Sequence, residues 1–397
     1  MKIRTLKDIQ DLKGKKVLLR VDFNVPLKEN GDIQDDTRIT ESLETINYLR
    51  EHGAKLIIIS HLGRPDGKVK EDLRLTKIAK YLSELLGCPV KKLDEVIGTQ
   101  VTQAVSEMSY GDIIMLENVR FEPGEEACDE TFTSALAALG DIFVNDAFSA
   151  AHRRHASTAG IAEHLPAYGG FLMEREILHL APIVEEEPIR PLTLIFGGAK
   201  IDTKIDTIKY FIEKADHFLI GGALANTFLA AAGYNIGYSL FEKDKLEVAR
   251  EIMLECEKHH ERFILPHDVT VASEISDDAE TANVPIEDVL GDMRILDIGK
   301  WTAEKFANIV VDSGTVIWNG PLGMCEHEPF QYGTKIVATA MAKTDCISII
   351  GGGDTIDALK RINVPPEKFT HISTGGGACM EFLAGKALPG IEVLKAE

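Results

Sequence analysis

The sequence lacks several features that mark other classes of protein. Its six cysteines stand at positions 88, 128, 256, 325, 346 and 379 and form no CxxC pair, so they indicate neither a disulfide framework nor a zinc site. Residues 1–16 have no apolar core and therefore do not resemble a secretory signal. We expect a reduced, cytoplasmic protein.

Positive charge is also scarce, because 43 lysines and arginines face 63 acidic residues and the formal net charge is −20. This balance argues against partners such as nucleic acid or anionic membranes, which are bound through basic surfaces. Residues 218–241 contain no charged side chain, but their four glycines and two asparagines favour a strand–turn–helix over a membrane span. Any site for a polyanion must therefore collect its few basic residues locally.

The common signatures of nucleotide and hydrolase sites are missing. The sequence contains no GxxxxGK[ST] and no GxGxxG, which argues against a Walker-type loop and against a nicotinamide-dependent oxidoreductase. It also contains neither HExxH nor a serine nucleophile elbow.

Apolar runs alternate with helical patterns along the first half of the chain, which predicts a parallel sheet with helices on both faces. In such sheets, ligands bind beyond the carboxyl ends of the strands. The expected strands are residues 17–25, 55–60, 112–118 and 141–148, and the expected helices are residues 36–52, 74–87 and 130–140.

Arginine and histidine side chains follow these strands at four successive places. A single loop arginine is usually only solvated, but a group of them in an acidic protein predicts a basic pocket for a small, multiply charged anion. The residues at these ends and in the adjacent turn are Arg20, Asp22, Asn24, Arg38, His61, Arg64, Arg120, His152, Arg153, Arg154 and His155.

The second half repeats the alternation, with strand ends rich in glycine instead of arginine. Glycine lets the backbone approach a flat base, a ribose and phosphates, so we interpret this half as a nucleotide-binding α/β domain. The expected strands are residues 192–196, 217–222, 262–272, 315–323, 346–355 and 369–378.

Residues 192–209 form a phosphate-binding candidate. A buried strand is followed by Gly197-Gly198 and by a helical pattern, a geometry that presents free N–H groups to an anion. Lys200 and Lys204 are four residues apart and would share one helix face. An ordinary turn with two solvated lysines is the alternative.

Two further glycine turns carry candidates. Asp354 follows a strand and Gly351–Gly353, and it could hold Mg²⁺ on nucleotide phosphates or cap the next helix. Gly375–Gly377 offers a second nest of N–H groups for a phosphoryl group in flight.

Seven ordered motifs, RVDFNVP, SHLGRP, ENVRF, AHRRHAS, GGAK, WNGPLG and GGGDT, closely resemble those of the phosphoglycerate kinase family. The resemblance implies two Rossmann-like, doubly wound parallel-sheet domains joined by a helix. It places the substrate domain at residues 1–170, the helix at 171–187, the nucleotide domain at 188–375, and at 376–397 a segment that returns to the first domain. It also implies a monomer whose domains close during the reaction.

The implied reaction is Mg²⁺-dependent phosphoryl transfer between 1,3-bisphosphoglycerate with ADP and 3-phosphoglycerate with ATP. A non-catalytic nucleotide-binding protein of the same fold is the alternative. By resemblance, the substrate residues are Asp22, Asn24, Arg38, His61, Arg64, Arg120 and Arg153. The nucleotide residues are Gly198, Ala199, Lys204, Gly222, Asn319, Pro321, Glu326, Gly352, Gly353, Asp354 and Thr355, with Asp354 on the metal. Arg38, Lys200 and Gly376 would stabilise the transferring phosphoryl group.

Three positions depart from the family's usual residues. Cys325 stands where phenylalanine is common, Lys300 where proline is usual, and Ser149 replaces a common glycine. The segment GGALANTF also lacks a third glycine. Base selectivity is therefore left open.

Overall fold

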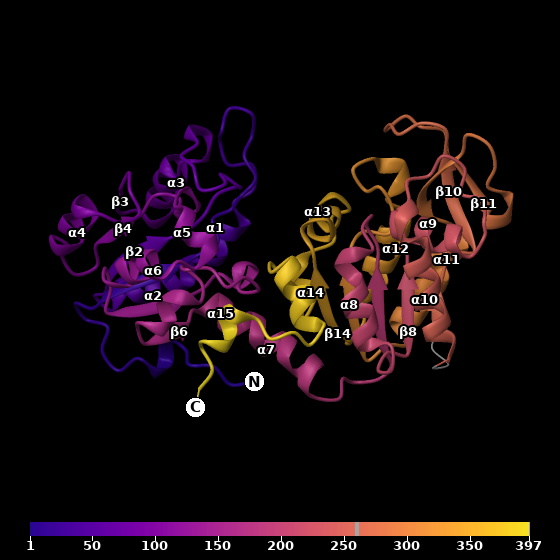
Figure 1. Ribbon diagram of the computed structural model, residues 1–397. Coiled ribbons are helices and arrows are strands. Elements are labelled where there is room, and N and C mark those ends of the chain that lie inside the picture. Colours follow the sequence, from indigo (N-terminus) through magenta and orange to yellow (C-terminus); the bar gives the residue numbers. More distant parts are fainter. Residues whose placement is uncertain (259–261, 397) are drawn as a thin grey trace. The chain divides into compact units, whose positions relative to one another are not determined.

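The structure, a computed structural model, describes residues 1–258 and 262–396. The chain divides into two compact units (Figure 1). The N-unit comprises Met1–Leu178 and Ala387–Glu397, and the C-unit comprises His179–Lys386. Within the described residues, no helix has both the length and the apolar character needed to cross a membrane.

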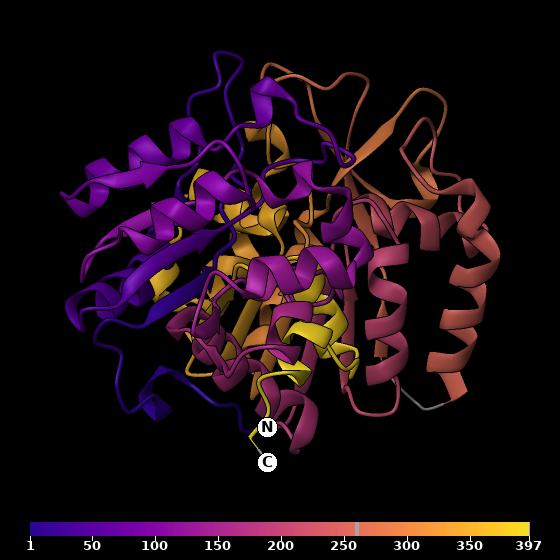
Figure 2. The same cartoon turned by 60° about the vertical axis from the view of Figure 1, so that its left-hand side comes forward.

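The N-unit is built on a parallel six-stranded sheet with the strand order β3-β4-β2-β1-β5-β6. The chain runs outward from β1 in both directions, so the crossover helices lie on both faces (Figures 1 and 2). The strands are β1 (Lys16–Arg20), β2 (Lys55–Ile59), β3 (Val90–Lys92), β4 (Ile113–Met115), β5 (Ile142–Asn145) and β6 (Ala167–Gly169). The helices are α1 (Thr37–Glu41), α2 (Leu43–Glu51), α3 (Thr76–Leu86), α4 (Thr99–Ser106), α5 (Pro123–Ala127) and α6 (Glu130–Ala137).

The C-unit repeats this plan with the order β15-β14-β13-β7-β8-β9. Its strands are β7 (Leu192–Phe196), β8 (His217–Ile220), β9 (Arg262–Ile264), β13 (Thr315–Asn319), β14 (Ile347–Gly351) and β15 (His371–Ser373). Its helices are α8 (Asp202–Phe211), α9 (Gly222–Ala231), α10 (Leu246–Lys258), α11 (Lys300–Val311), α12 (Tyr332–Met341), α13 (Gly353–Arg361) and α14 (Gly377–Leu383). The prediction of two α/β domains with parallel sheets is confirmed.

The element boundaries differ from the prediction in two places. The expected helix 36–52 is two helices, α1 and α2, which meet at the buried Ser42, whose hydroxyl bonds back to the Arg38 carbonyl at 3.2 Å. The expected strand 262–272 is also wrong, because β9 ends before Pro266, which has no N–H to continue a ladder.

The chain beyond Pro266 enters an antiparallel sheet with the order β11-β10-β12, which the sequence pattern did not indicate. Its strands are β10 (Asp268–Ala272), β11 (Ala282–Pro285) and β12 (Arg294–Ile298). This sheet forms part of the C-unit's ligand cavity, which is described below.

The helix expected at 171–187 is α7 (Phe171–Glu185), which runs from the N-unit into the C-unit. Residues 376–386 belong to the C-unit and not to the returning segment in which the sequence placed them, because α14 packs on α8 and the Thr207 hydroxyl bonds the Met380 carbonyl at 3.0 Å. The segment that joins the N-unit starts at Ala387 and includes α15 (Pro389–Glu392).

This C-terminal segment completes the N-unit. Leu394 is fully buried, its carbonyl accepts the Arg4 N–H at 2.8 Å, and the Gly390 N–H bonds the Ala151 carbonyl at 2.8 Å. Residues nearly 400 positions apart therefore share one core.

We predict that Leu394→Ala lowers the free energy of unfolding by about 2–5 kcal/mol, because it removes buried methyl groups and leaves a cavity. Lys395→Ala, at the exposed neighbouring position, should change it by less than about 0.5 kcal/mol. Denaturant unfolding measures both. Equal, small effects of the two substitutions would show that the segment does not stabilise the unit.

Candidate active site

The N-unit collects the predicted residues where its strand order reverses, between β1 and β5. Asp22, just after β1, lies at the centre. Its Oδ2 accepts hydrogen bonds from Arg38 Nη1 at 2.6 Å and from the Ser149 hydroxyl, and its Oδ1 lies 3.6 Å from His61 Nδ1. The serine that departs from the family pattern thus binds the central carboxylate. The structure brings these residues together as the sequence predicted.

This packing lowers the pKa values of both Asp22 and His61. Burial of the Asp22 carboxyl opposes its ionisation, but the attraction of His61 and Arg38 and the Ser149 hydrogen bond outweigh it and lower the pKa of Asp22 to about 2. Burial, followed by repulsion from Arg20, Arg120 and Arg38, holds the pKa of His61 well below its ordinary value despite the nearby Asp22. Asp22 therefore stays ionised at neutral pH, and His61 lies beside it as a hydrogen-bonding group.

Asn24 and Arg120 join the cluster through the glycine of SHLGRP. The Gly63 N–H bonds Asn24 Oδ1 at 2.8 Å, and Arg120 Nη1 donates to the Gly63 carbonyl at 2.8 Å. Arg64, the next residue, is exposed, and no ion pair to it is found within the described chain. The exposed guanidinium is available to a ligand.

Arginines crowd together at this end of the sheet. Burial lowers the pKa of Arg120, Glu126 opposes this shift, and Arg153 and Arg20 add to it. Burial together with Arg120, Arg153 and Arg20 lowers the pKa of His155 to about 4. Mutual repulsion among these cations is relieved by an anion, so the cluster suits a multiply charged anionic ligand.

A supporting layer lies beneath the cluster. The sequence placed Arg20 in the basic pocket but gave Ser157 and Glu125 no role. Arg20 is almost fully buried, and its Nε donates to Ser157 Oγ at 2.8 Å. Ser157 in turn donates to the buried Glu125 at 2.6 Å. Arg20, the first residue of RVDFNVP, was the only member of this layer that the sequence marked.

Arg153 and Arg154 have different surroundings. Arg153 is half-buried, and its Nε donates to His152 Nε2 at 3.0 Å within the cluster. Arg154 is exposed and forms an ion pair with Glu163. The structure thus supports the choice of the first arginine of AHRRHAS for the cluster.

The glycine-rich strand ends of the C-unit meet at its own order reversal, between β7 and β13. The Gly198 N–H bonds the Pro321 carbonyl at 2.8 Å, and the Gly198 carbonyl accepts the Leu224 N–H at 2.8 Å. A side chain at Gly222 would press on the Gly198 nitrogen, with Cβ only 2.7 Å away, so only glycine permits this approach. The three loops are therefore packed backbone to backbone.

A cavity of about 270 Å³ opens beside these loops. Apolar side chains and backbone form most of its wall, which suits a planar base with a few polar groups to orient it. The predicted residues that line it are Gly198, Ala199, Gly222, Pro321, Glu326 and Asp354. Tyr238, Leu240, Ile275, Arg294 and Asp297 also line it and were not predicted.

The two lysines of GGAKIDTK differ more than their spacing suggested. Lys200 is exposed and precedes α8, so the expectation that both lie on one helix face is wrong. Lys204 is buried, and its Nζ lies 3.3 Å from the Lys200 carbonyl and 3.0 Å from Thr203 Oγ1. Burial lowers the pKa of Lys204, whereas the negative charges of Asp354 and Glu242 raise it.

Asp354 is exposed in the first turn of α13 and does not cap it, because Gly352 is the N-cap residue. Thr355 Oγ1 accepts the Gly320 N–H at 2.7 Å and donates to the Gly351 carbonyl at 2.9 Å. The buried Asn319 lies beside Gly352, because its Nδ2 would be 2.9 Å from a Cβ built at Gly352. The next residue, Gly353, is exposed. This turn presents backbone N–H groups and one carboxylate to the solvent.

Within the described residues, no group of three or more His, Cys, Asp and Glu could enclose a metal ion. One exposed carboxylate beside a glycine turn still fits Mg²⁺, which takes one or two protein carboxylates and completes its shell with water and phosphate oxygens. Asp354 would hold the ion, which supplies charge neutralisation at the phosphates.

Gly376 is the N-cap residue of α14, with φ of +53°, and no atom lies within 4 Å of a Cβ built there. The turn is open as well as glycine-rich. The Gly375 N–H donates to Ser373 Oγ at 3.1 Å and the Ala378 N–H to the Gly375 carbonyl at 3.0 Å, so an anion here would be met by the N–H groups of Gly376 and Gly377.

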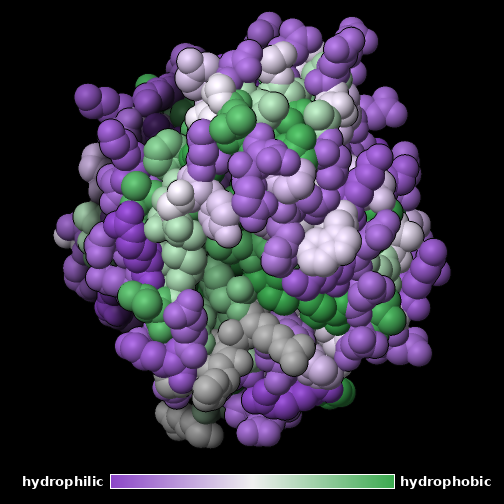
Figure 3. All heavy atoms as spheres, turned by 90° about the vertical axis from the view of Figure 1, so that its right-hand side faces the viewer, coloured by the Kyte–Doolittle hydropathy of each residue, from purple (hydrophilic) through white to green (hydrophobic). Residues whose placement is uncertain are grey.

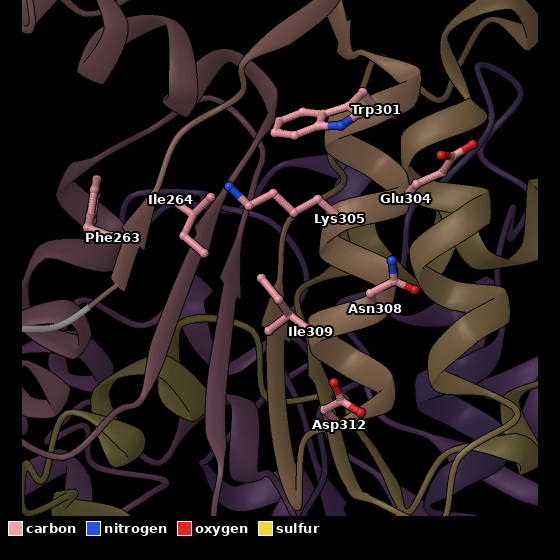
Figure 4. A pocket seen from close by; sticks show the side chains of 8 residues that line it. All are labelled: Phe263, Ile264, Trp301, Glu304, Lys305, Asn308, Ile309 and Asp312. Carbon is pink, nitrogen blue, oxygen red and sulfur yellow. The ribbon is translucent and has the colours of Figure 1, made fainter.

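A larger hollow of about 780 Å³ lies elsewhere on the C-unit, between β9 and α11. Lys305 and Ile309 of α11 extend toward Ile264 of β9 (Figure 4). Figure 3 shows this side of the unit, where apolar surface is interrupted by polar side chains. The hollow contains none of the predicted residues, and its mixed charges do not suit a polyanion.

Comparison with known proteins gives one consistent result. A model of the family described as phosphoglycerate kinase matches residues 6–386. The chain is 51% identical to the phosphoglycerate kinase of Dictyoglomus turgidum over 395 residues, which is 99% of each chain.

Solved structures agree with this match. The phosphoglycerate kinase of Coxiella burnetii has a TM-score of 0.87 and 38% identity, with 99% of both chains covered. That of Pyrococcus horikoshii has a TM-score of 0.87 and 34% identity, with 99% of this chain and 98% of the other covered. The chain therefore belongs to the phosphoglycerate kinase family, and it is a glycolytic transferase that moves a phosphoryl group reversibly between 1,3-bisphosphoglycerate with ADP and 3-phosphoglycerate with ATP.

Proposed function

We propose that the N-unit cluster binds the phosphoglycerate. The observation that carries this assignment is the gathering of mutually repelling cations where the N-unit's strand order reverses. Arginines pair with the phosphate and carboxylate, and the ionised Asp22 accepts a hydrogen bond from a substrate hydroxyl. The contact residues are Asp22, Asn24, Arg38, His61, Arg64, Arg120 and Arg153.

The C-unit binds the nucleotide with its Mg²⁺. The base enters the 270 Å³ cavity, Glu326 reaches the ribose, and Lys204 neutralises the phosphates. Asp354 holds the metal ion. The remaining contacts come from Gly198, Ala199, Gly222, Asn319, Pro321, Gly352, Gly353 and Thr355.

The chemistry needs no general base, because the acceptor carboxylate is already ionised at neutral pH, its pKa being about 4. The obstacle is repulsion between that carboxylate and the polyphosphate. Arg38, Lys200 and the N–H groups at Gly376 are assigned to the charge that spreads over the phosphoryl group in transit. Since each unit holds one reactant, closure of the units must bring the reactants together and exclude water from the acyl phosphate.

The same proposal includes a monomer that works in the cytoplasm on small-molecule substrates. All six cysteines are free thiols, which supports a reducing compartment.

The direct test of function is a coupled assay of ADP formation from ATP and 3-phosphoglycerate. We predict activity with Mg²⁺ and none after chelation, and we predict that Asp354→Asn raises the Mg²⁺ concentration needed for half-maximal rate about tenfold or more. A non-catalytic nucleotide-binding protein would form no ADP under any of these conditions. An unchanged Mg²⁺ requirement in Asp354→Asn would remove this residue from the metal site.

Arg153→Ala should raise the Kd for 3-phosphoglycerate about tenfold to a hundredfold, because a hydrogen bond to a charged group contributes roughly 1.5–3 kcal/mol. Arg154→Ala, the matched control, removes only an exposed ion pair with Glu163 and should change this Kd less than about twofold. Calorimetry measures both. A larger loss in Arg154→Ala would reverse the assignment of the pair.

Replacing Lys200 and replacing Lys204 should affect different quantities, kcat in one case and the Kd for ADP in the other. Lys200→Ala should lower kcat by about 10²–10³, because it removes a group used mainly in the transition state. Lys204→Ala should chiefly raise the Kd for ADP, since its ammonium faces resting phosphates. If Lys200→Ala weakens ADP binding as much as it lowers kcat, the division of roles is wrong.

A further inference from the structure

Asp297 forms part of the nucleotide cavity wall and has no assigned role. It lies on β12 and is only 2% exposed, and no ion pair links it to any residue within 1–258 or 262–396. The other two carboxyl groups of the cavity wall, Glu326 and Asp354, are exposed. A buried carboxyl without a cation is costly to keep, so its contacts deserve an explanation.

The carboxyl joins two elements of the C-unit. Oδ1 accepts the Ile298 N–H at 2.8 Å, and Oδ2 accepts the Gly333 N–H at 2.8 Å in the first turn of α12. Asp297 thereby links β12 of the antiparallel sheet to α12.

A third segment, residues 321–326, lies directly over the same carboxyl. Any side chain at Gly323 would overlap the carboxyl carbon of Asp297, so this approach requires glycine. The Met324 N–H bonds the Leu296 carbonyl at 2.8 Å, and Cys325 Sγ donates to Thr334 Oγ1 of α12 at 3.2 Å. The next residue is Glu326, at the mouth of the cavity.

We propose that Asp297 is a positioning residue for the nucleotide, whose carboxyl seats residues 323–326 against β12 and α12 so that Glu326 meets the ribose. This inference rests on the proposed contact between Glu326 and the nucleotide. It explains why a buried carboxyl is kept where an apolar residue would cost less.

The amide of asparagine cannot take over this role. It has a single acceptor oxygen, while two N–H groups point at the carboxyl, so one N–H would face the amide NH₂ group. The asparagine side chain would have no room to rearrange, because Gly323 and Gly333 both pack closely against the side chain of residue 297.

Protonation gives an independent readout. Burial raises the pKa of Asp297 to about 8, and the N–H groups of Gly333 and Ile298 only partly offset this. Among the neighbouring groups, Thr270 on β10 and Thr334 on α12 carry no charge. Burial raises the pKa of Cys325 to about 12, and the negative charges of Asp297 and Glu326 add to this shift. Arg294 lies on its own strand, at the cavity wall. Above that pH, the added negative charge repels the like charge of Glu326 and shifts this side chain away from the ribose, so ADP affinity should fall as the pH rises through about 8.

The test is a double-mutant cycle on the full-length protein, with the Kd for Mg-ADP and for 3-phosphoglycerate measured by calorimetry. Asp297→Asn should raise the ADP Kd about tenfold and leave the 3-phosphoglycerate Kd within about twofold. In a Glu326→Gln background, the same substitution should raise the ADP Kd less than about threefold, because the group it positions is already altered.

Asp268→Asn is the matched control. Asp268 is also a buried carboxyl, on the neighbouring strand β10, but it accepts hydrogen bonds from the start of α11, including Thr302 Oγ1 at 2.6 Å, and does not line the cavity. This variant should lower the melting temperature without changing the ADP Kd.

Additive effects in the cycle, or an equal loss of 3-phosphoglycerate affinity, would overturn the proposal. An unchanged ADP Kd in Glu326→Gln would instead show that the ribose contact is wrongly assigned, and the role of Asp297 would fall with it.

If Asp297→Asn does not fold, the test is the pH dependence of the ADP Kd in the wild type and in Glu326→Gln. The wild-type ADP Kd should rise about threefold between about pH 7.5 and about pH 9.5, and the rise should be smaller in Glu326→Gln. The lowered pKa of Lys204 is common to both proteins, so any contribution from this lysine cancels in the comparison. Identical pH profiles would contradict a route through Glu326.

Discussion

The site depends on one constraint of parallel sheets: every strand of such a sheet ends at the same edge, and a crevice opens where the strand order reverses. Both units have this reversal, between β1 and β5 and between β7 and β13. Residues far apart in the sequence, such as Asp22 and Ser149, meet there without any local signal that they will. Asp22 and Ser149 are therefore held by the segments that follow two neighbouring strands, β1 and β5.

The two crevices differ in their charged and polar groups. In a chain with a net charge of −20, the N-unit packs arginines close enough to repel one another, so that an anionic ligand stabilises the cluster. The C-unit instead has glycine turns with backbone N–H groups, together with a buried ammonium, Lys204, whose pKa the negative charges of Asp354 and Glu242 raise against the effect of burial. Under the proposed assignment, this division gives each reactant its own half-site.

The sequence could predict the strand ends, because buried strands and the glycine, arginine and histidine residues that follow them are local features. It could not separate Lys200 from Lys204, since the start of α8 is set by packing and not by spacing. It joined β9 to β10 across Pro266, and it gave no role to Asp297, whose burial depends on a helix more than thirty residues later. Contacts between distant segments are what sequence patterns omit.

The central claim is that each reactant has its own half-site, and amide hydrogen exchange tests it most directly. With 3-phosphoglycerate alone, the account predicts slowed exchange at residues 22–24, 61–64 and 149–155, with the C-unit unchanged. With Mg-ADP alone, it predicts slowed exchange at residues 197–204, 319–326 and 351–355, with the N-unit cluster unchanged. Protection of the C-unit's glycine turns by 3-phosphoglycerate in the absence of nucleotide would contradict the account.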